Sequence, residues 1–356
     1  MSAPAMTLER ARELSAATQG MDEAQTRGVL ALLMGGTLAP ADGGALLAAW
    51  NARGETGVEL AALVRGLLER AAPLRLPGRI LDLCGTGGSG LGRYNVSTTA
   101  AFVLAGTGVR VAKHGNRGSV TANGSFDLLD ALQVPFQLSP AGHATVLEHS
   151  GVCFLFARLM HPAVAAVAPY RKAAGRRTIF NLAGPLANPG RPQIQLIGVA
   201  NWAQAEVLAE ALERLGIERA VVVQGEPGID EVSVSGETRW IEVRRQGAHH
   251  LRTRGSYRHA MHFPYQELPS GTGPDNARQF AALLAGTGQP GLEAMVSANA
   301  AVALDLWHDR ALFTTAAPLT AAREALRSGA VLAAFERHRR LAQELTRAAA
   351  QGAGET

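Results

Sequence analysis

A short apolar run that ends in glycine constrains the fold of this chain more than any other feature. Residues 79–84 read Arg-Ile-Leu-Asp-Leu-Cys, and the glycine-rich string GTGGSG follows at 85–90. A run of this length that ends at a turn signal predicts a strand buried on both faces, as in a parallel sheet. A helical stretch at 97–104 and a second strand-like run at 109–112 come next, so the segment predicts a βαβ unit.

The chain repeats this alternation further on. Strand-like runs recur at 152–156, 194–199 and 220–224, with helical stretches between them. Strands that alternate with helices predict the α/β class, here with a mostly parallel central sheet.

The residues before the first strand show only helical signals. Thr56 and Glu59 form a capping-box pattern ahead of leucines and a valine spaced along one helical face. We therefore expect two domains, a small helical one at 1–75 and a large α/β one at 76–356.

Composition excludes several classes of protein. The start of the chain lacks a signal-peptide pattern, and no run of 18 apolar residues occurs, so we expect a cytoplasmic protein with no membrane partner. The spacing of the two cysteines suits neither a zinc site nor a redox motif. A net charge of +4 with 5% aromatic residues makes nucleic acid an unlikely ligand, because basic residues do not interleave with aromatic ones.

The glycine-rich string has two interpretations. It formally matches the dinucleotide fingerprint GxGxxG, but the second strand leads into Lys113 instead of the acidic residue that binds ribose. No Asp or Glu occurs from Leu83 through Phe126. This segment predicts a positive potential suited to phosphates, to which loop amides and a helix N-terminus add. The alternative is a glycine turn followed by an ordinary basic surface.

A second glycine-containing cluster favours the phosphate interpretation. Residues 113–119 read KHGNRGS where the second strand is expected to end, so both loops should meet at the carboxyl edge of the sheet. Nearby hydroxyl groups would add donors, which suits a ligand with several phosphates. The hydroxyl groups in question belong to Ser97, Thr98, Ser119 and Ser125.

Several later motifs accompany these two loops. The full set is GTGGS at 85–89, NVST at 95–98, KHGNR at 113–117, HPA at 161–163, RTIFN at 177–181, GPL at 184–186, NP at 188–189 and the acidic pair at 230–231. Together these motifs resemble the anthranilate phosphoribosyltransferase family, and they follow the family order from about residue 53 to the helix that contains Asn299.

The resemblance implies a fold, an activity and partners. The fold would be nucleoside phosphorylase-like, with the helical domain completed by helices near 160–190 and a homodimer formed through it. The enzyme, a pentosyltransferase of tryptophan biosynthesis, would transfer phosphoribosyl from phosphoribosyl pyrophosphate (PRPP) to the amine of anthranilate, with release of pyrophosphate and with Mg²⁺ as cofactor.

The resemblance also implies site residues, position by position. Those expected to bind PRPP are Gly85, Gly88, Ser89, Arg93, Asn95, Val96, Ser97, Thr98, Lys113, His114, Gly115, Asn116, Arg117, Gly118, Ser119, Val120, Thr121 and Ser125. Anthranilate would contact Gly85, Asn116, His161 and Arg171, and Mg²⁺ would bind Ser97, Asp230 and Glu231. Lys113 would neutralise the leaving pyrophosphate. Arg171 would take the benzoate carboxylate bidentately and leave the amine free to attack.

Two positions depart from the family pattern inside the first loop. Ser89 stands where the family has an aspartate, and Arg93 replaces a threonine. Both changes make the pocket less negative, so we expect tighter phosphate binding and weaker dependence on, or inhibition by, magnesium. Three other functions fit the same features: a family paralogue with a different acceptor, a non-catalytic member that binds nucleic acid, and a pyrimidine nucleoside phosphorylase, which the acceptor-side motifs disfavour.

Overall fold

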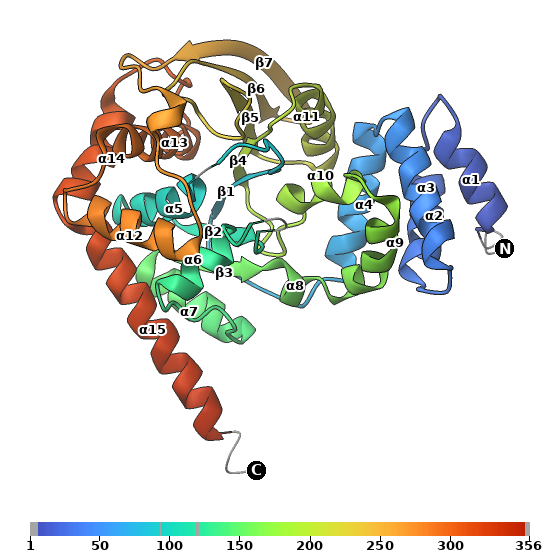
Figure 1. Ribbon diagram of the computed structural model, residues 1–356, viewed down its shortest axis with the longest axis horizontal. Coiled ribbons are helices and arrows are strands. Elements are labelled where there is room, and N and C mark those ends of the chain that lie inside the picture. Colours follow the sequence, from blue (N-terminus) through green and yellow to red (C-terminus); the bar gives the residue numbers. More distant parts are fainter. Residues whose placement is uncertain (1–5, 93, 119–120, 353–356) are drawn as a thin grey trace.

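The computed structural model describes residues 6–92, 94–118 and 121–352. Arg93, Ser119 and Val120, three residues expected to bind PRPP, therefore lie outside the described residues. The chain begins with four helices (Figure 1), which are α1 (Leu8–Ala16), α2 (Glu23–Met34), α3 (Pro40–Arg53) and α4 (Gly57–Glu69).

Local sequence signals explain where these first helices start. The expected capping box is confirmed at α4, where the Thr56 hydroxyl accepts the Glu59 N–H and the Glu59 carboxylate accepts the Thr56 N–H. Glu59 is fully buried and also pairs with the Arg53 guanidinium. Its carboxylate therefore caps one helix and fastens the end of another.

A seven-stranded sheet forms the centre of the molecule and confirms the expected α/β class. Its spatial order is β3-β2-β1-β4-β5-β6-β7, and β1 to β5 run parallel. The parallel strands are β1 (Leu81–Gly85), β2 (Val111–Gly115), β3 (Val152–Phe156), β4 (Ile194–Gly198) and β5 (Arg219–Gly225). All five carboxyl ends therefore lie along one edge of the sheet.

The second strand corrects one expectation. We predicted a strand at 109–112 with a loop from Lys113 onward, whereas β2 runs through Lys113 and His114 to Gly115. The physical reason is pairing: β2 matches β3 residue by residue, from Val111 opposite Val152 to Gly115 opposite Phe156. The backbone bonds of the ladder hold these polar residues in extended form whatever their side chains prefer.

An antiparallel hairpin, which was not predicted from the sequence, completes the sheet. It consists of β6 (Glu237–Gln246) and β7 (His249–Arg258), joined at Gly247, whose φ of +60° suits a tight turn. Its strands are rich in arginine and only partly buried, so the apolar runs that reveal central strands are missing here.

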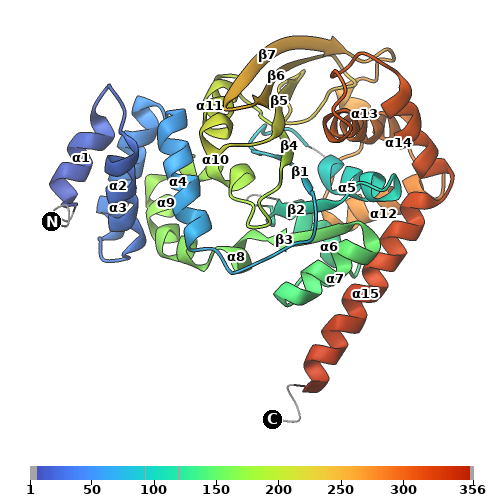
Figure 2. The same cartoon turned by 180° about the vertical axis from the view of Figure 1, so that it is seen from behind.

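Helices cover both faces of the sheet (Figures 1 and 2). One apolar core joins the sheet to α5 (Val96–Gly106), α12 (Gly273–Leu284), α13 (Pro290–Trp307), α14 (Ala317–Arg327) and α15 (Ala330–Gly352). A second core joins the other face to α4, α10 (Ile179–Leu186) and α11 (Ala203–Leu215). No described helix is both long enough and apolar enough to cross a membrane.

The remaining helices of the described chain are mostly short. They are α6 (Ser125–Ala131), α7 (Pro140–Ser150), α8 (Ala157–Met160), η1 (Pro162–Val167), α9 (Ala168–Ala174) and η2 (Tyr265–Glu267). Helix α9 packs against α3, and α10 packs against α3 and α4. Segments more than a hundred residues apart in sequence thereby form one helical group, hereafter the helical lobe, consisting of α1 to α4 with α9 and α10.

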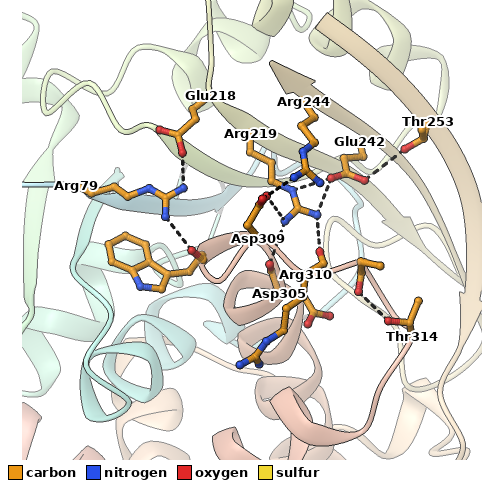
Figure 3. A network of polar contacts seen from close by, with 12 residues as sticks. Arg79, Glu218, Arg219, Glu242, Arg244, Thr253, Asp305, Asp309, Arg310 and Thr314 are labelled. Atoms are coloured by element: carbon orange, nitrogen blue, oxygen red, sulfur yellow. Dashed lines mark hydrogen bonds and ion pairs between the residues drawn. The ribbon is translucent and has the colours of Figure 1, made fainter. Parts of the chain in front are cut away.

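A polar network joins the amino-terminal end of β5 to the end of α13 (Figure 3). Arg219, buried in the sheet, donates to Glu242 Oε1 (2.7 Å), Asp305 O (3.1 Å) and Arg310 O (2.6 Å). Every donating group of this arginine faces an acceptor, which offsets the cost of burying its charge. The network lies at the edge opposite the carboxyl ends of the parallel strands, so we infer that its role is to stabilise the fold.

Candidate functional site

The glycine-rich loop leaves the carboxyl end of β1. Gly87, Gly88 and Gly90 have φ values of +65°, +85° and +70°, which other residues rarely adopt. Gly85 is constrained differently, because a Cβ there would lie 2.1 Å from Asp230 Oδ2. The glycines of this string are therefore required by backbone conformation and by the close approach of a distant acidic residue.

Asp230 reaches this loop from the connection between β5 and β6. Its buried carboxylate accepts the Gly87 N–H through Oδ2 at 2.7 Å. Gly198, the last residue of β4, makes room for the same segment, since a Cβ there would lie 1.7 Å from Asp230 O. The structure thus brings the expected metal-binding pair against the expected phosphate loop, although Gly87 and Asp230 are 143 positions apart in the sequence.

A pocket joins the loop to the acidic pair. Ser89, Val96, Asp230 and Glu231 line it, together with Gly92, Tyr94, Ile229, Tyr265, Leu268, Pro269, Leu292 and Met295. The Tyr265 hydroxyl donates to Gly92 O at 2.6 Å and so ties η2 to the loop. Within the described residues no group of three or more His, Cys, Asp and Glu residues gathers around one point. The adjacent carboxylates of Asp230 and Glu231, with the Ser89 hydroxyl in the same lining, fit Mg²⁺, which prefers oxygen ligands and keeps several waters; Ser97, the third expected ligand, is not among the lining residues.

The start of α5 forms another wall. Among the described residues no side chain caps this helix, in contrast to α2 and α4, which both have capping boxes. Ser97 and Thr98 lie in its first turn, and the buried Thr98 hydroxyl has no hydrogen-bond partner in the described chain. An uncapped helix N-terminus is a ready site for an anion.

Asn95, just before α5, has a structural task. Its amide nitrogen donates to Asn123 O, and its amide oxygen accepts from Asn276 Nδ2, both at 2.7 Å. Asn95 therefore holds the loop after β2 and helix α12 against the start of α5. No pattern in the sequence pointed to Asn276 as a residue of this region.

The loop after β2 is organised by Asp127, which was not selected from the sequence. The Oδ2 atom of Asp127 accepts the N–H groups of Gly118 and Gly124, each at 2.8 Å, and Oδ1 lies 3.3 Å from Arg117 Nη1. Asp130 also pairs with Arg117, and its hydrogen bond raises the pKa of this guanidinium. Asn116 and Thr121 are exposed on the same loop.

This arrangement corrects the expected charge of the loop. The acid-free segment ends one residue before Asp127, and the fold returns Asp127 and Asp130 to Arg117. The positive potential inferred from the sequence is therefore partly neutralised by acids from outside the segment. Gly115 and Ser125 do meet, since a Cβ on Gly115 would lie 3.1 Å from Ser125 Oγ.

Lys113 lies inside the sheet. Its ammonium group belongs to a side chain that is almost fully buried, and it donates to Leu83 O at 2.7 Å. Asp82, fully buried on β1, accepts from Asn188 Nδ2 at 2.9 Å and from the His114 N–H at 3.3 Å. Burial raises the pKa of Asp82 to about 6, against the opposing effects of Lys113 and Asn188. Asp82 was not selected as a site residue from the sequence, although a single acidic residue within an apolar strand could have drawn attention to it.

The rings of two buried histidines meet edge to face, with an angle of 75° between their planes. The rings of His114 and His161 lie 5.3 Å apart, and they contact Gly184 O (3.1 Å) and Ala187 O (2.7 Å) respectively. Burial lowers the pKa of His114 to about 3 and also lowers that of His161. Both rings are therefore neutral at ordinary pH and pack against α10.

Arg171 lies on α9 with Arg177 nearby. The guanidinium of Arg171 lies 6.0 Å from the centre of the Phe180 ring and forms no ion pair with any described residue. Burial, and then the charge of Arg177, lower the pKa of Arg171. Arg177 Nη2 donates to Thr86 O in the glycine-rich loop at 2.9 Å. Arg177 thus contacts the loop, and its charge acts on the neighbouring Arg171.

Comparisons with known proteins agree with this geometry. A family model described as "Glycosyl transferase family, a/b domain" matches residues 77–332. Anthranilate phosphoribosyltransferase of Roseiflexus castenholzii is 40% identical over 321 residues, which cover 89% of this chain and 93% of the relative. That of Thermomicrobium roseum is 40% identical over 337 residues, 93% of this chain and 96% of the relative.

A solved structure is similar over almost the whole chain. The crystal structure of anthranilate phosphoribosyltransferase from Thermus thermophilus has a TM-score of 0.84 at 36% identity and covers 94% of this chain and 99% of its own. The glycine-rich loop, the acidic pair and the two-sided α/β sheet occur here in a chain 40% identical to such relatives. This chain therefore belongs to the anthranilate phosphoribosyltransferase family.

Proposed function

We propose that this protein is an anthranilate phosphoribosyltransferase of tryptophan biosynthesis. It transfers the phosphoribosyl group of PRPP to the amine of anthranilate and releases pyrophosphate. The convergence of the glycine-rich loop, the start of α5 and the Asp230–Glu231 pair around one pocket carries the proposal. Such a site suits a ligand with phosphate groups and a bound cation.

The phosphates of PRPP would meet neutral donors and a helix N-terminus. The first turn of α5, with Ser97 and Thr98, would hold one phosphate, because its amides lack a capping side chain among the described residues. The loop amides and Ser89 would hold the pyrophosphate. Lys113, buried beside Leu83 O, would act on the pyrophosphate through its charge.

Asp230 and Glu231, with the Ser97 hydroxyl, would hold Mg²⁺. The ion would neutralise negative charge on the departing pyrophosphate. A yeast anthranilate phosphoribosyltransferase of the same fold has been solved in complex with PRPP and Mg. At 22% identity that structure supports the fold, and the ligands of this chain remain our proposal.

Arg171 would orient the acceptor. Its guanidinium can take a benzoate carboxylate with two parallel hydrogen bonds, which leaves the amine on the neighbouring carbon free. An aromatic amine attacks without prior deprotonation, so we assign no general base. The neutral rings of His114 and His161 fit this assignment, because at ordinary pH neither supplies a charge.

We further propose a cytoplasmic homodimer that associates through the helical lobe. The lobe would form a domain of residues 1–75, completed by helices near 160–190, beside a larger domain of residues 76–356. The packing of α9 and α10 against α3 and α4 supports this division. Light scattering coupled to gel filtration would measure the mass of the particle.

Fluorescence tests the activity directly. The protein is incubated with PRPP, Mg²⁺ and anthranilate, and loss of anthranilate fluorescence is followed, with omission of PRPP as the control. We expect turnover that stops when EDTA removes the metal. Binding of PRPP without turnover of anthranilate would favour a different acceptor. Absence of turnover together with tight binding of single-stranded DNA at physiological salt would favour the nucleic-acid-binding alternative.

A further inference from the structure

The peptide group between Thr86 and Gly87 is held at both ends by side chains from distant parts of the chain. Its carbonyl oxygen accepts from Arg177 Nη2 at 2.9 Å, and its N–H donates to Asp230 Oδ2 at 2.7 Å. Rotation of this peptide about the chain axis would break both bonds. One arginine and one aspartate therefore fix the direction in which the loop continues.

Arg177 also packs closely against Gly88 in the same loop. Gly88 has a φ of +85°, and a Cβ there would lie 1.7 Å from Arg177 Nη1. The guanidinium thus occupies the space that a side chain at position 88 would need. The crowding is confined to Gly88, since a Cβ at Gly90 would meet nothing within 4 Å.

The place of Arg177 in the fold gives this contact its rigidity. Arg177 comes directly before Thr178, the N-cap residue of α10, whose N–H donates to Asn181 Oδ1 at 2.9 Å. Helix α10 contributes to the core shared by the helical lobe and the sheet. The guanidinium is therefore presented to the loop from a backbone segment that is itself anchored.

We propose that Arg177 is a positioning residue for PRPP, which holds the Thr86–Gly87 peptide in the orientation that the loop needs to receive the pyrophosphate. The inference rests on the proposed function, because PRPP is taken as the ligand of the loop. Arg177 differs here from Arg171, which we assign to the acceptor. The neighbouring Arg176 is exposed and makes no hydrogen bond or ion pair with another described residue, so it serves as a matched control.

The first test compares R177A with R176A. Loss of a hydrogen bond from a charged donor is expected to raise the Kd of PRPP, measured by calorimetry with Mg²⁺, about ten- to hundredfold in R177A. R176A should bind PRPP as the unchanged protein does. The conservative R177K variant retains a cation that can reach a carbonyl, and we expect it to restore part of the affinity.

A second variant reaches the same contact from the loop. G88A should raise the Kd of PRPP for two reasons: alanine is strained at a φ of +85°, and its Cβ should push the guanidinium away from Thr86 O. The second contribution should disappear in an R177A background, where that collision is absent. If R177A does not fold, R177K decides the question, because it should still bind PRPP more weakly than R176A does. A melting temperature of R177A within about 2 °C of that of R176A would show that the loss is local.

The outcomes separate this inference from the proposed function. Equal PRPP affinity of R177A and R176A, or of G88A and the unchanged protein, would overturn the positioning role even if anthranilate is consumed. A weakened affinity in R177A that R177K restores would support it even if anthranilate proves not to be the acceptor. Failure of the unchanged protein to bind PRPP would overturn both.

Discussion

Replacement of His338 by asparagine is expected to change how the stability of this protein depends on pH. His338, on α15, is fully buried between Phe102 and Phe154, with its Nδ1 atom 2.9 Å from Val152 O. Burial lowers the pKa of this ring from 6.5 to about 4, which outweighs the opposing effect of Val152 O. The folded protein therefore keeps the ring neutral.

The direction and the magnitude of this change in stability follow from the linkage between protonation and folding. Between the two pKa values the unfolded chain binds a proton that the folded chain does not, so stability is full above about pH 6.5 and falls as the pH is lowered. A change from 6.5 to about 4 corresponds to about 3 kcal/mol in total, of which about 2 kcal/mol is lost by pH 5. Asparagine cannot take up this proton, whereas its amide can still donate to Val152 O.

Urea denaturation followed by circular dichroism at pH 5, 6, 7 and 8 would measure the effect. H338N should be less stable than the unchanged protein at pH 7, because it leaves a cavity. The difference should shrink by about 2 kcal/mol at pH 5. The exposed His149 of α7 is the control, and H149N should track the unchanged protein. A constant difference between H338N and the unchanged protein across this range would refute the reasoning.

Three further substitutions test the site. R171A should raise the KM for anthranilate by about ten- to hundredfold, because a charged hydrogen-bonding pair is lost. The control K172A, at an exposed position, should leave this KM unchanged. Steady-state kinetics with each substrate varied in turn would distinguish an effect on anthranilate from an effect on PRPP. S89D adds a third carboxylate to the pocket of Asp230 and Glu231, so turnover should depend more steeply on magnesium, and an unchanged magnesium titration would contradict the proposed role of Ser89. The pKa of Asp82 is raised to about 6, so its ionisation lowers the stability of the folded protein as the pH rises. Relative to the unchanged protein, the free energy of unfolding of D82N, measured by urea denaturation, should therefore increase by about 2 kcal/mol between pH 4 and pH 7. No such increase would contradict this environment for Asp82.

Local signals predicted much of the fold because they act within a few residues. The capping box of Thr56 and Glu59 begins α4 as expected, and the apolar run at 152–156 matches β3. The hairpin at 237–258 was not predicted, because β6 and the edge strand β7 are rich in arginine, are only partly buried and lack a continuous apolar run.

The candidate site divides in the same way. The glycine-rich loop could be read from the sequence because positive φ values demand glycine, whereas the acidic pair was expected only from its place in the family's order of motifs. Asp127, Asn276 and Arg177 were missed, since their contacts join residues that only the fold brings together. The charge of the second loop was misjudged for the same reason.

The sequence by itself determined that a buried strand ends in a glycine loop with phosphate-binding potential, because apolar periodicity and glycine conformation are local properties. Only the tertiary structure decided which way that loop faces. Its Thr86–Gly87 peptide is oriented by Arg177 from the helical lobe and by Asp230 from beyond β5. Hydrogen bonds between such distant residues depend on the packing of the sheet and its helices, which no short stretch of sequence records.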